Sequence, residues 1–282
     1  MKSPLTFTLA FSIVLWLFTG CADDDTTSPI EVPAGLTDFA DSFEGVGTNL
    51  DLLFPADNSR WSKFQQVNTA GGNNQAFLVD TSATDGAHAL YLFAQPGNDP
   101  LSKMDIEKGG FAAVAGQTVR IEADFRINSN ENLADMLLLD FECCSCWDPD
   151  VPDNKCPGVR LLFSGGNDFL SIERGKIGHE TILQQQVAFP RFAWTKVVWE
   201  MTLSPEEDGL NVLSINGEEV IRASAKNLPN ATDFKEQAAG QGVDFTLQEP
   251  VFYERLQVGA TAKVRGSDVA LLVDNVSVSI RD

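Results

Sequence analysis

The chain has 282 residues, 43% of them hydrophobic and 21% charged, which is the composition of a globular protein long enough to bury a core. It carries 40 Asp and Glu against 20 Lys and Arg, a formal net charge of −20. A field of that sign repels phosphate backbones and anionic head groups, so nucleic acid and anionic membrane surfaces are excluded as partners. Carboxylates in such excess can also gather around calcium, which prefers oxygen ligands.

The N-terminal residues have the pattern of an export signal. Met1-Lys2 supplies a positive start, and the apolar run from Leu5 to Phe18 is too short to span a membrane. The stretch Leu-Phe-Thr-Gly before Cys21 resembles a bacterial lipobox, although Phe18 stands where Leu is usual. This resemblance implies a signal peptide over residues 1–20 and lipidation of Cys21. An ordinary cleavable signal with an incidental cysteine is the alternative.

An acidic run, Ala22 to Asp25, follows this cysteine and resembles the export signals of Bacteroidetes-type surface lipoproteins. The resemblance implies a lipid-anchored protein on the outer face of the outer membrane. Residues 21–35 are polar and punctuated by Pro, as expected of a flexible tether. Residues 36–282 are then expected to form a single folded domain, held to the membrane by the lipid anchor alone.

The folded part is predicted to be a series of about a dozen short strands separated by Gly, Pro, Asn and Asp. Alternation of apolar and polar residues is clearest from Val119 to Ile127, and Arg191 to Arg222 follows a strand-turn-strand-turn-strand pattern. Asn216-Gly217 between apolar runs predicts a type I′ hairpin turn. One short helix is expected around Ala231 to Ala238. The other predicted strands cover residues 39–44, 61–67, 75–79, 88–95, 136–142, 159–163, 169–173, 254–262 and 269–280.

This pattern predicts an all-β fold with at most one short helix. Two antiparallel sheets packed face to face, as a jelly-roll sandwich, bury the apolar side of each strand.

Beyond Cys21, the remaining cysteines are Cys143, Cys144, Cys146 and Cys156. An exported protein meets oxidising conditions, so two disulfides are expected. Adjacent cysteines are poorly placed to bond each other, which leaves 143–146 with 144–156, or 143–156 with 144–146. A four-thiolate zinc site is the alternative, disfavoured because no second C-x-x-C follows.

The acidic loop that follows Cys146, with Asp148, Asp150 and Asp153, only weakly suggests calcium.

Several short stretches resemble jelly-roll carbohydrate-binding modules and the wider concanavalin-A-like lectins and glucanases. They are Asp41–Glu44, Asp85–Leu90, Trp194–Val197, Asn216-Gly217 and Val269–Val278. The resemblance implies a structural calcium bound by Glu44 and Asp274, with a further ligand at His88. Two carboxylates brought together at a sheet edge repel each other unless a cation lies between them.

The catalytic motifs of this fold are not found in the sequence. Glu122-Ala123-Asp124 begins the glucanase pattern Glu-x-Asp-x-x-Glu but lacks its last Glu, and His179 is not preceded by the Gln of the alginate-lyase Gln-x-His. Glu122, Asp124 and His179 are therefore weak catalytic candidates. Asp140 and Glu142 also share a strand face and are interpreted as surface residues.

Sugar binding is suggested by aromatic side chains expected to be exposed, namely Trp61, Trp147 and Trp194. The predicted function is a cell-surface-tethered, non-catalytic lipoprotein that binds a glycan or polysaccharide. The alternatives are a polysaccharide lyase or glycoside hydrolase of this fold with an unrecognised site, or a structural or adhesive surface protein.

Overall fold

The computed structural model describes residues 31–68, 70–80, 83–96, 102–146, 156–164, 169–174, 180–263 and 268–282. All of the described elements lie in one compact unit, Glu31–Asp282. No described helix is long and apolar enough to cross a membrane.

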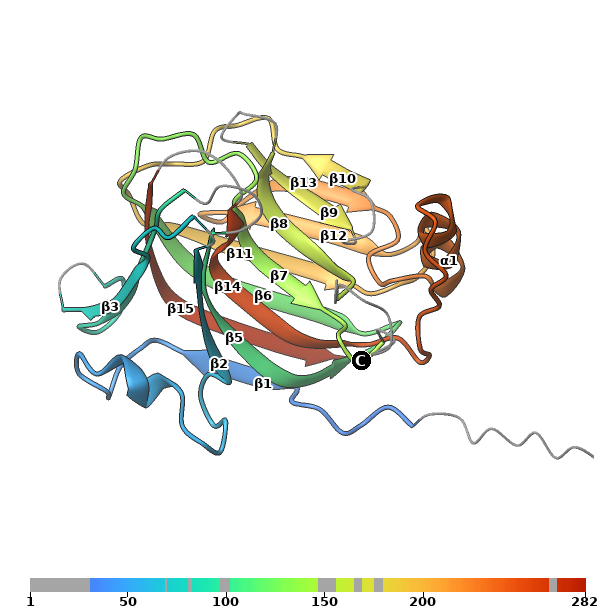
Figure 1. Cartoon of the computed structure of the whole chain (residues 1–282), viewed down its shortest axis with the longest axis horizontal. Coiled ribbons are helices and arrows are strands. Elements are labelled where there is room, and N and C mark those ends of the chain that lie inside the picture. Colours follow the sequence, from blue (N-terminus) through green and yellow to red (C-terminus); the bar gives the residue numbers. More distant parts are fainter. Residues whose placement is uncertain are drawn as a thin grey trace, which may run out of the picture. The chain divides into compact units, whose positions relative to one another are not determined.

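Two antiparallel sheets make up this unit (Figure 1). The 8-stranded sheet has the order β13-β12-β11-β6-β15-β4-β3, with β1 also paired to β15, and the 7-stranded sheet has the order β10-β9-β8-β7-β14-β5-β2. The first contains β1 (Asp38–Asp41), β3 (Gln75–Val79), β4 (Ala89–Ala94), β6 (Thr118–Ile127), β11 (Thr195–Thr202), β12 (Leu210–Ile215), β13 (Glu218–Ser224) and β15 (Val269–Arg281). The second contains β2 (Lys63–Asn68), β5 (Ser102–Ala113), β7 (Leu137–Glu142), β8 (Gly158–Ser164), β9 (Phe169–Arg174), β10 (Glu180–Gln184) and β14 (Tyr253–Lys263).

The predicted jelly-roll sandwich is confirmed. Most strands turn an apolar side into one core between the sheets; Ile121 and Phe125 of β6, for example, are fully buried. The hairpin between β12 and β13 turns at Asn216 (φ 50°) and Gly217 (φ 82°), the positive φ pair that a type I′ turn requires.

The expected short helix is present as α1 (Ala231–Gly240). Its N-cap is Asn230, whose Oδ1 accepts hydrogen bonds from the backbone N–H groups of Thr232 and Asp233. Three elements were not predicted from the sequence: the 3-10 helix η1 (Leu50–Leu53) and strands β5 and β10. The sequence of β5 contains two lysines, two acids and Gly109-Gly110, so it does not look like a buried strand.

Both disulfides form, in one of the two predicted combinations. Cys143 bonds Cys146 and Cys144 bonds Cys156, with Cα atoms 5.6 and 4.6 Å apart. The thiolate zinc site is therefore wrong, because all four sulfurs are used in covalent bonds. The acidic loop with Trp147, Asp148, Asp150 and Asp153 lies outside the described residues.

Candidate functional site

The 7-stranded sheet carries charged and amide side chains on the face turned away from the core. Core residues such as Met104 and Ile106 alternate with Asp105 and Glu107 along β5, and the neighbouring strands repeat this alternation. We call this surface the polar face. It consists of Lys103, Asp105, Glu107, Asp140, Glu142, Arg160, Glu173, Arg255 and Gln257.

Strand register aligns part of the polar face into a continuous row. Glu107 of β5 pairs with Gln257 of β14, which pairs with Asp140 of β7. Asp140 pairs with Arg160 of β8, and Arg160 pairs with Glu173 of β9. All five residues are at most 8% exposed, although the four charged ones are of types that are almost never buried in a protein without a partner.

Arg255 and Gln257 hold two of the carboxylates in place. Arg255 Nη2 donates to Glu142 Oε2 at 2.5 Å, and its Nη1 lies 3.4 Å from Glu107 Oε2. The Gln257 amide donates to the same two oxygens, at 3.0 Å and 3.4 Å respectively. Glu107 and Glu142 are thus fixed as charge-compensated carboxylates.

Lys103 and Asp105 form a second pair on the polar face. Lys103 Nζ donates to Gln257 Oε1 at 2.9 Å and to Gln65 Oε1 at 3.2 Å. It lies 3.7 Å from Asp105 Oδ2, close enough for an ion pair but too far for a hydrogen bond. The ammonium is therefore positioned by two amides and contacts the aspartate through charge alone.

Asp105 has the most strongly perturbed carboxyl group on this face. It is fully buried, and neither of its oxygens accepts a hydrogen bond within the described structure. Burial raises the pKa of Asp105 to about 7; Lys103 opposes this rise, whereas the charges of Glu107 and Asp140 add to it. A carboxyl group with that pKa exchanges its proton near neutral pH, as a general acid or base does.

Arg160 is a further charged residue of the polar face with buried hydrogen-bonding atoms that have no partner in the described structure. It is 7% exposed, and its Nε and Nη2 have no hydrogen-bond acceptor in the described structure. Buried donors are almost always paired in native proteins, so the unpaired atoms mark a place where a ligand or water completes the site.

The polar face is not the surface on which the predicted catalytic residues lie. Glu122 and Asp124 are on β6, in the other sheet. Glu122 is 2.6 Å from Lys196 Nζ and accepts a 2.7 Å hydrogen bond from Arg120, while Asp124 accepts one from Asn275. These contacts are polar pairs within β6 and between β6 and its neighbours β11 and β15. His179 lies outside the described residues.

Among the aromatic candidates, Trp61 is not exposed as predicted. It is fully buried, parallel to Phe43 at a centroid distance of 6.1 Å and edge-on to Phe39 at 5.1 Å. The prediction that it binds sugar is wrong, because its ring fills the core. Trp194 is half-buried beside β11, and Trp147 is not among the described residues.

The three residues predicted to bind calcium hold a loop instead of converging on one point. Glu44 Oε1 accepts hydrogen bonds from the backbone N–H groups of Ala87 and His88, at 2.7 and 2.6 Å. Asp274 Oδ2 accepts from the backbone N–H of Thr84 at 2.7 Å. In this arrangement both carboxylates bond the loop backbone, and we derive no step from a calcium ion.

Among the described residues, one group of three possible metal ligands has its ligand atoms within 4.8 Å of one another, namely Glu142 with Cys144 and Cys156. The two sulfurs are joined in a disulfide and cannot act as thiolate ligands. Calcium therefore stays a prediction from the family resemblance.

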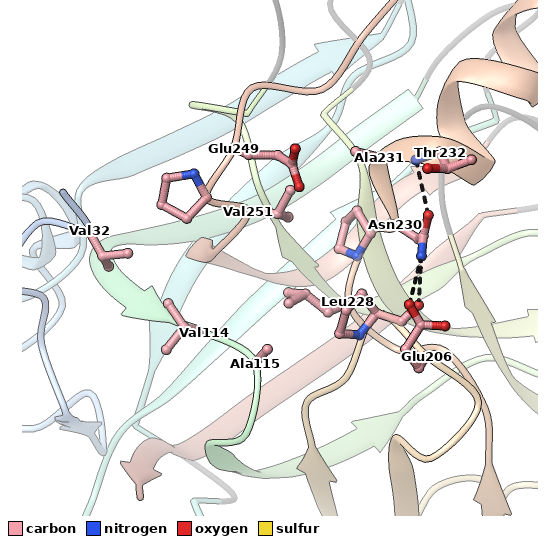
Figure 2. Close-up of a pocket in the computed structure, with 13 residues that line it drawn as sticks. Val32, Val114, Ala115, Glu206, Leu228, Asn230, Ala231, Thr232, Glu249 and Val251 are labelled. Carbon is pink, nitrogen blue, oxygen red and sulfur yellow. Dashed lines mark hydrogen bonds between the residues drawn. The ribbon is translucent and has the colours of Figure 1, made fainter. Parts of the chain in front are cut away.

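A separate hollow of about 510 Å³ lies at the N-terminal end of α1 (Figure 2). Its lining is mostly apolar, including Val114, Leu228 and Val251. The Asn230 side chain caps α1 and donates to Glu206 Oε1 at 3.3 Å, so its polar atoms are used within the fold. We place the candidate site on the polar face, where charged groups are buried and partly unpaired.

The sequence did not single out seven of the nine polar-face residues. Three of them lie on β5, which was not predicted, whereas the other four lie on predicted strands whose neighbours in the sheet the sequence does not reveal. The alternation of Lys103, Asp105 and Glu107 with Met104 and Ile106 is the signal that could have revealed β5. Asp140 and Glu142 were noticed as sharing a strand face but interpreted as surface residues, whereas both are buried.

No protein-family model matches this sequence, and no curated protein matches it. Solved structures with a similar fold include an endo-β-1,4-glucuronan lyase from the fungus Trichoderma reesei, with a TM-score of 0.56, 13% identity, and coverage of 78% of this chain and 90% of that one. The cellulose-induced protein Cip1 has a TM-score of 0.52, 13% identity and coverage of 86% and 96%. The alginate lyase Aly36B has a TM-score of 0.51, 10% identity and coverage of 87% and 98%.

At these identities the likeness shows the shared jelly-roll sandwich fold. It also contradicts the prediction of a non-catalytic glycan-binding protein, because two of these neighbours are named as glucuronan and alginate lyases. The alternative of a polysaccharide lyase is the one that the neighbours favour.

Proposed function

We propose that this protein is a polysaccharide lyase with its active site on the polar face. The observation that carries the proposal is the buried Asp105–Lys103 pair, held at 3.7 Å beside a row of charged side chains. The fold is one on which glucuronan and alginate lyases are built. Because fold does not by itself imply function, the proposal depends on the chemistry of this pair.

Cleavage by a lyase requires a base and an acid but consumes no water. Asp105 as carboxylate removes the proton from the carbon that bears the sugar's carboxyl group. The electron pair left behind forms a carbon–carbon double bond as the bond to the glycosidic oxygen breaks. Lys103 supplies a proton to the departing oxygen. A base whose pKa is about 7 is half ionised at neutral pH and suits this role.

Glycoside hydrolysis is the second candidate, favoured by one observation. The polar face carries five carboxylates, Asp105, Glu107, Asp140, Glu142 and Glu173, against three cationic side chains. Hydrolases use a pair of carboxyl groups as acid and nucleophile or base, and do not need to bind an acidic sugar. Such a face is less suited to an anionic polymer than one rich in arginine.

The two reactions are separated by their products. We expect incubation with glucuronan or alginate to generate the ultraviolet absorbance of a conjugated double bond in step with new reducing ends. New reducing ends without this absorbance would establish hydrolysis and contradict the lyase. An Asp105→Asn variant is the matched control, and a neutral β-glucan tests the need for a uronic acid.

We also propose that the protein is exported and anchored to the outer membrane through a lipid on Cys21, facing the cell exterior. The support is the lipobox-like sequence and the acidic run after it. We expect Cys21→Ala to move the protein from the membrane fraction to the soluble fraction and to abolish its labelling by a fatty-acid analogue. Unchanged labelling in the variant would contradict lipidation at this position. Cys21 itself lies outside the described residues.

A further inference from the structure

Arg160 is separated from the Asp105–Lys103 pair by the width of several strands. In the order of the 7-stranded sheet, β7 and β14 lie between β8, which carries Arg160, and β5. Adjacent strands are about 4.8 Å apart, so the two backbones are about 14 Å apart. This distance exceeds one sugar ring. Arg160 therefore faces a part of a bound polymer different from the one at which the proposed proton transfer occurs.

In the described structure, Nε and Nη2 of Arg160 have no hydrogen-bond partner. Its neighbours in the row are Asp140 and Glu173, but among the described residues no ion pair or hydrogen bond joins either of them to Arg160. Elsewhere on the polar face each cation has a carboxylate partner, Arg255 with Glu142 and Lys103 with Asp105. Burying a charge without a partner is costly, and proteins retain such strain mainly at functional sites.

From this geometry we infer that Arg160 forms an anion-binding subsite that recognises the carboxylate of a uronic acid residue away from the cleavage point. Its planar guanidinium has two free N–H directions, at Nε and Nη2, which match the two oxygens of a carboxylate. The inference rests on the proposed function, which is the reason for taking the bound polymer to be a polysaccharide. It adds that a second acidic unit, away from the cleavage point, is recognised, and it names the residue that binds this unit.

Binding measurements test this subsite without requiring turnover. In an Asp105→Asn background, calorimetry compares a glucuronic acid trisaccharide with the same trisaccharide as its neutral methyl ester. We expect the acid to bind roughly 10- to 100-fold more tightly than the ester, as a charge-assisted hydrogen-bond pair would give. Adding Arg160→Met should remove this preference and leave the affinity for the ester unchanged.

Arg126 provides a matched control. It lies on β6 in the other sheet, is half-buried and has Asn128 as its hydrogen-bond partner in the described structure. Arg126→Met should keep the full preference for the acid. Melting curves check folding, and Arg160→Met should melt no lower than the parent because it removes an uncompensated buried charge.

A preference for the acid that survives Arg160→Met would overturn the inference. So would tighter binding of a sulfated neutral trisaccharide than of the uronate, since the subsite would then be assigned to a sulfate ester. The preference can persist even if no unsaturated product forms in the cleavage assay. In that case the lyase proposal fails while the subsite stands, so the two failures are distinguishable.

Discussion

Asp105→Asn is expected to lower kcat on the substrate polysaccharide by roughly 10²- to 10⁴-fold, the usual contribution of a general base. The substitution keeps the shape of the side chain but removes the group that exchanges a proton. In the parent enzyme, kcat/KM should rise with pH and level off above about 7, because the carboxylate form is the active base and burial raises the pKa of Asp105 to about 7. Initial rates of double-bond formation across pH 5–9 measure both effects.

The same variant is expected to gain stability at neutral pH. The pKa of Asp105 in the folded protein, about 7, lies above its ordinary value of 3.8, so the folded state binds more protons between these two values. The free energy of unfolding therefore falls as pH rises through this interval. Asn does not titrate, so the gain from Asp105→Asn should be absent near pH 4 and largest above pH 7, at roughly 4 kcal/mol at most.

Denaturant unfolding at pH 4 and pH 8 measures this difference. A variant that loses activity and is also less stable at pH 8 would indicate that Asp105 serves only as the structural partner of Lys103. Lys103→Met is the matched control. It removes the cation opposing the rise in the pKa of Asp105, so the acid limb of the remaining activity should move to higher pH.

Trp61→Ala is expected to destabilise the folded protein by about 3–5 kcal/mol, because it leaves a cavity in the core where the indole packs against Phe39 and Phe43. The indole Nε1 has no hydrogen bond within the described structure, so the loss comes from packing. Denaturant unfolding measures the change. Phe77→Ala, at a ring that is 48% exposed, should change stability much less and is the control.

Binding separates this structural role from the sugar-stacking role predicted for Trp61. Below the unfolding transition, folded Trp61→Ala protein should bind the glucuronic acid trisaccharide as tightly as the parent does. If Trp61→Ala had the stability of the parent but bound the trisaccharide more weakly, Trp61 would have to contact the ligand.

Local signals were sufficient for much of the fold. The alternation along Val119–Ile127 predicted β6, because a strand with one buried face must repeat every two residues. Asn216-Gly217 predicted its turn because few other residue pairs tolerate two successive positive φ angles. The clustered cysteines predicted two disulfides, although only the structure selected between two pairings.

The candidate site depended on pairing between distant segments. Glu107, Gln257 and Arg160 are far apart in the chain, and only the register of four strands, β5, β14, β7 and β8, brings them into one row. Sequence patterns report which side of a strand is apolar, but they do not report which strands are neighbours. The interpretation of Asp140 and Glu142 as surface residues failed for that reason.

The amino-acid sequence by itself determined the fold class, the helix, the type I′ turn and the presence of two disulfides, since each depends on residues close together in the chain. The tertiary structure alone decided that Trp61 is core, that Asp105 is buried beside Lys103, and that Nε and Nη2 of Arg160 have no hydrogen-bond partner in the described part of the chain. Burial and charge compensation are properties of the packed sheet. They arise from side chains that meet only after strands far apart in the sequence have paired.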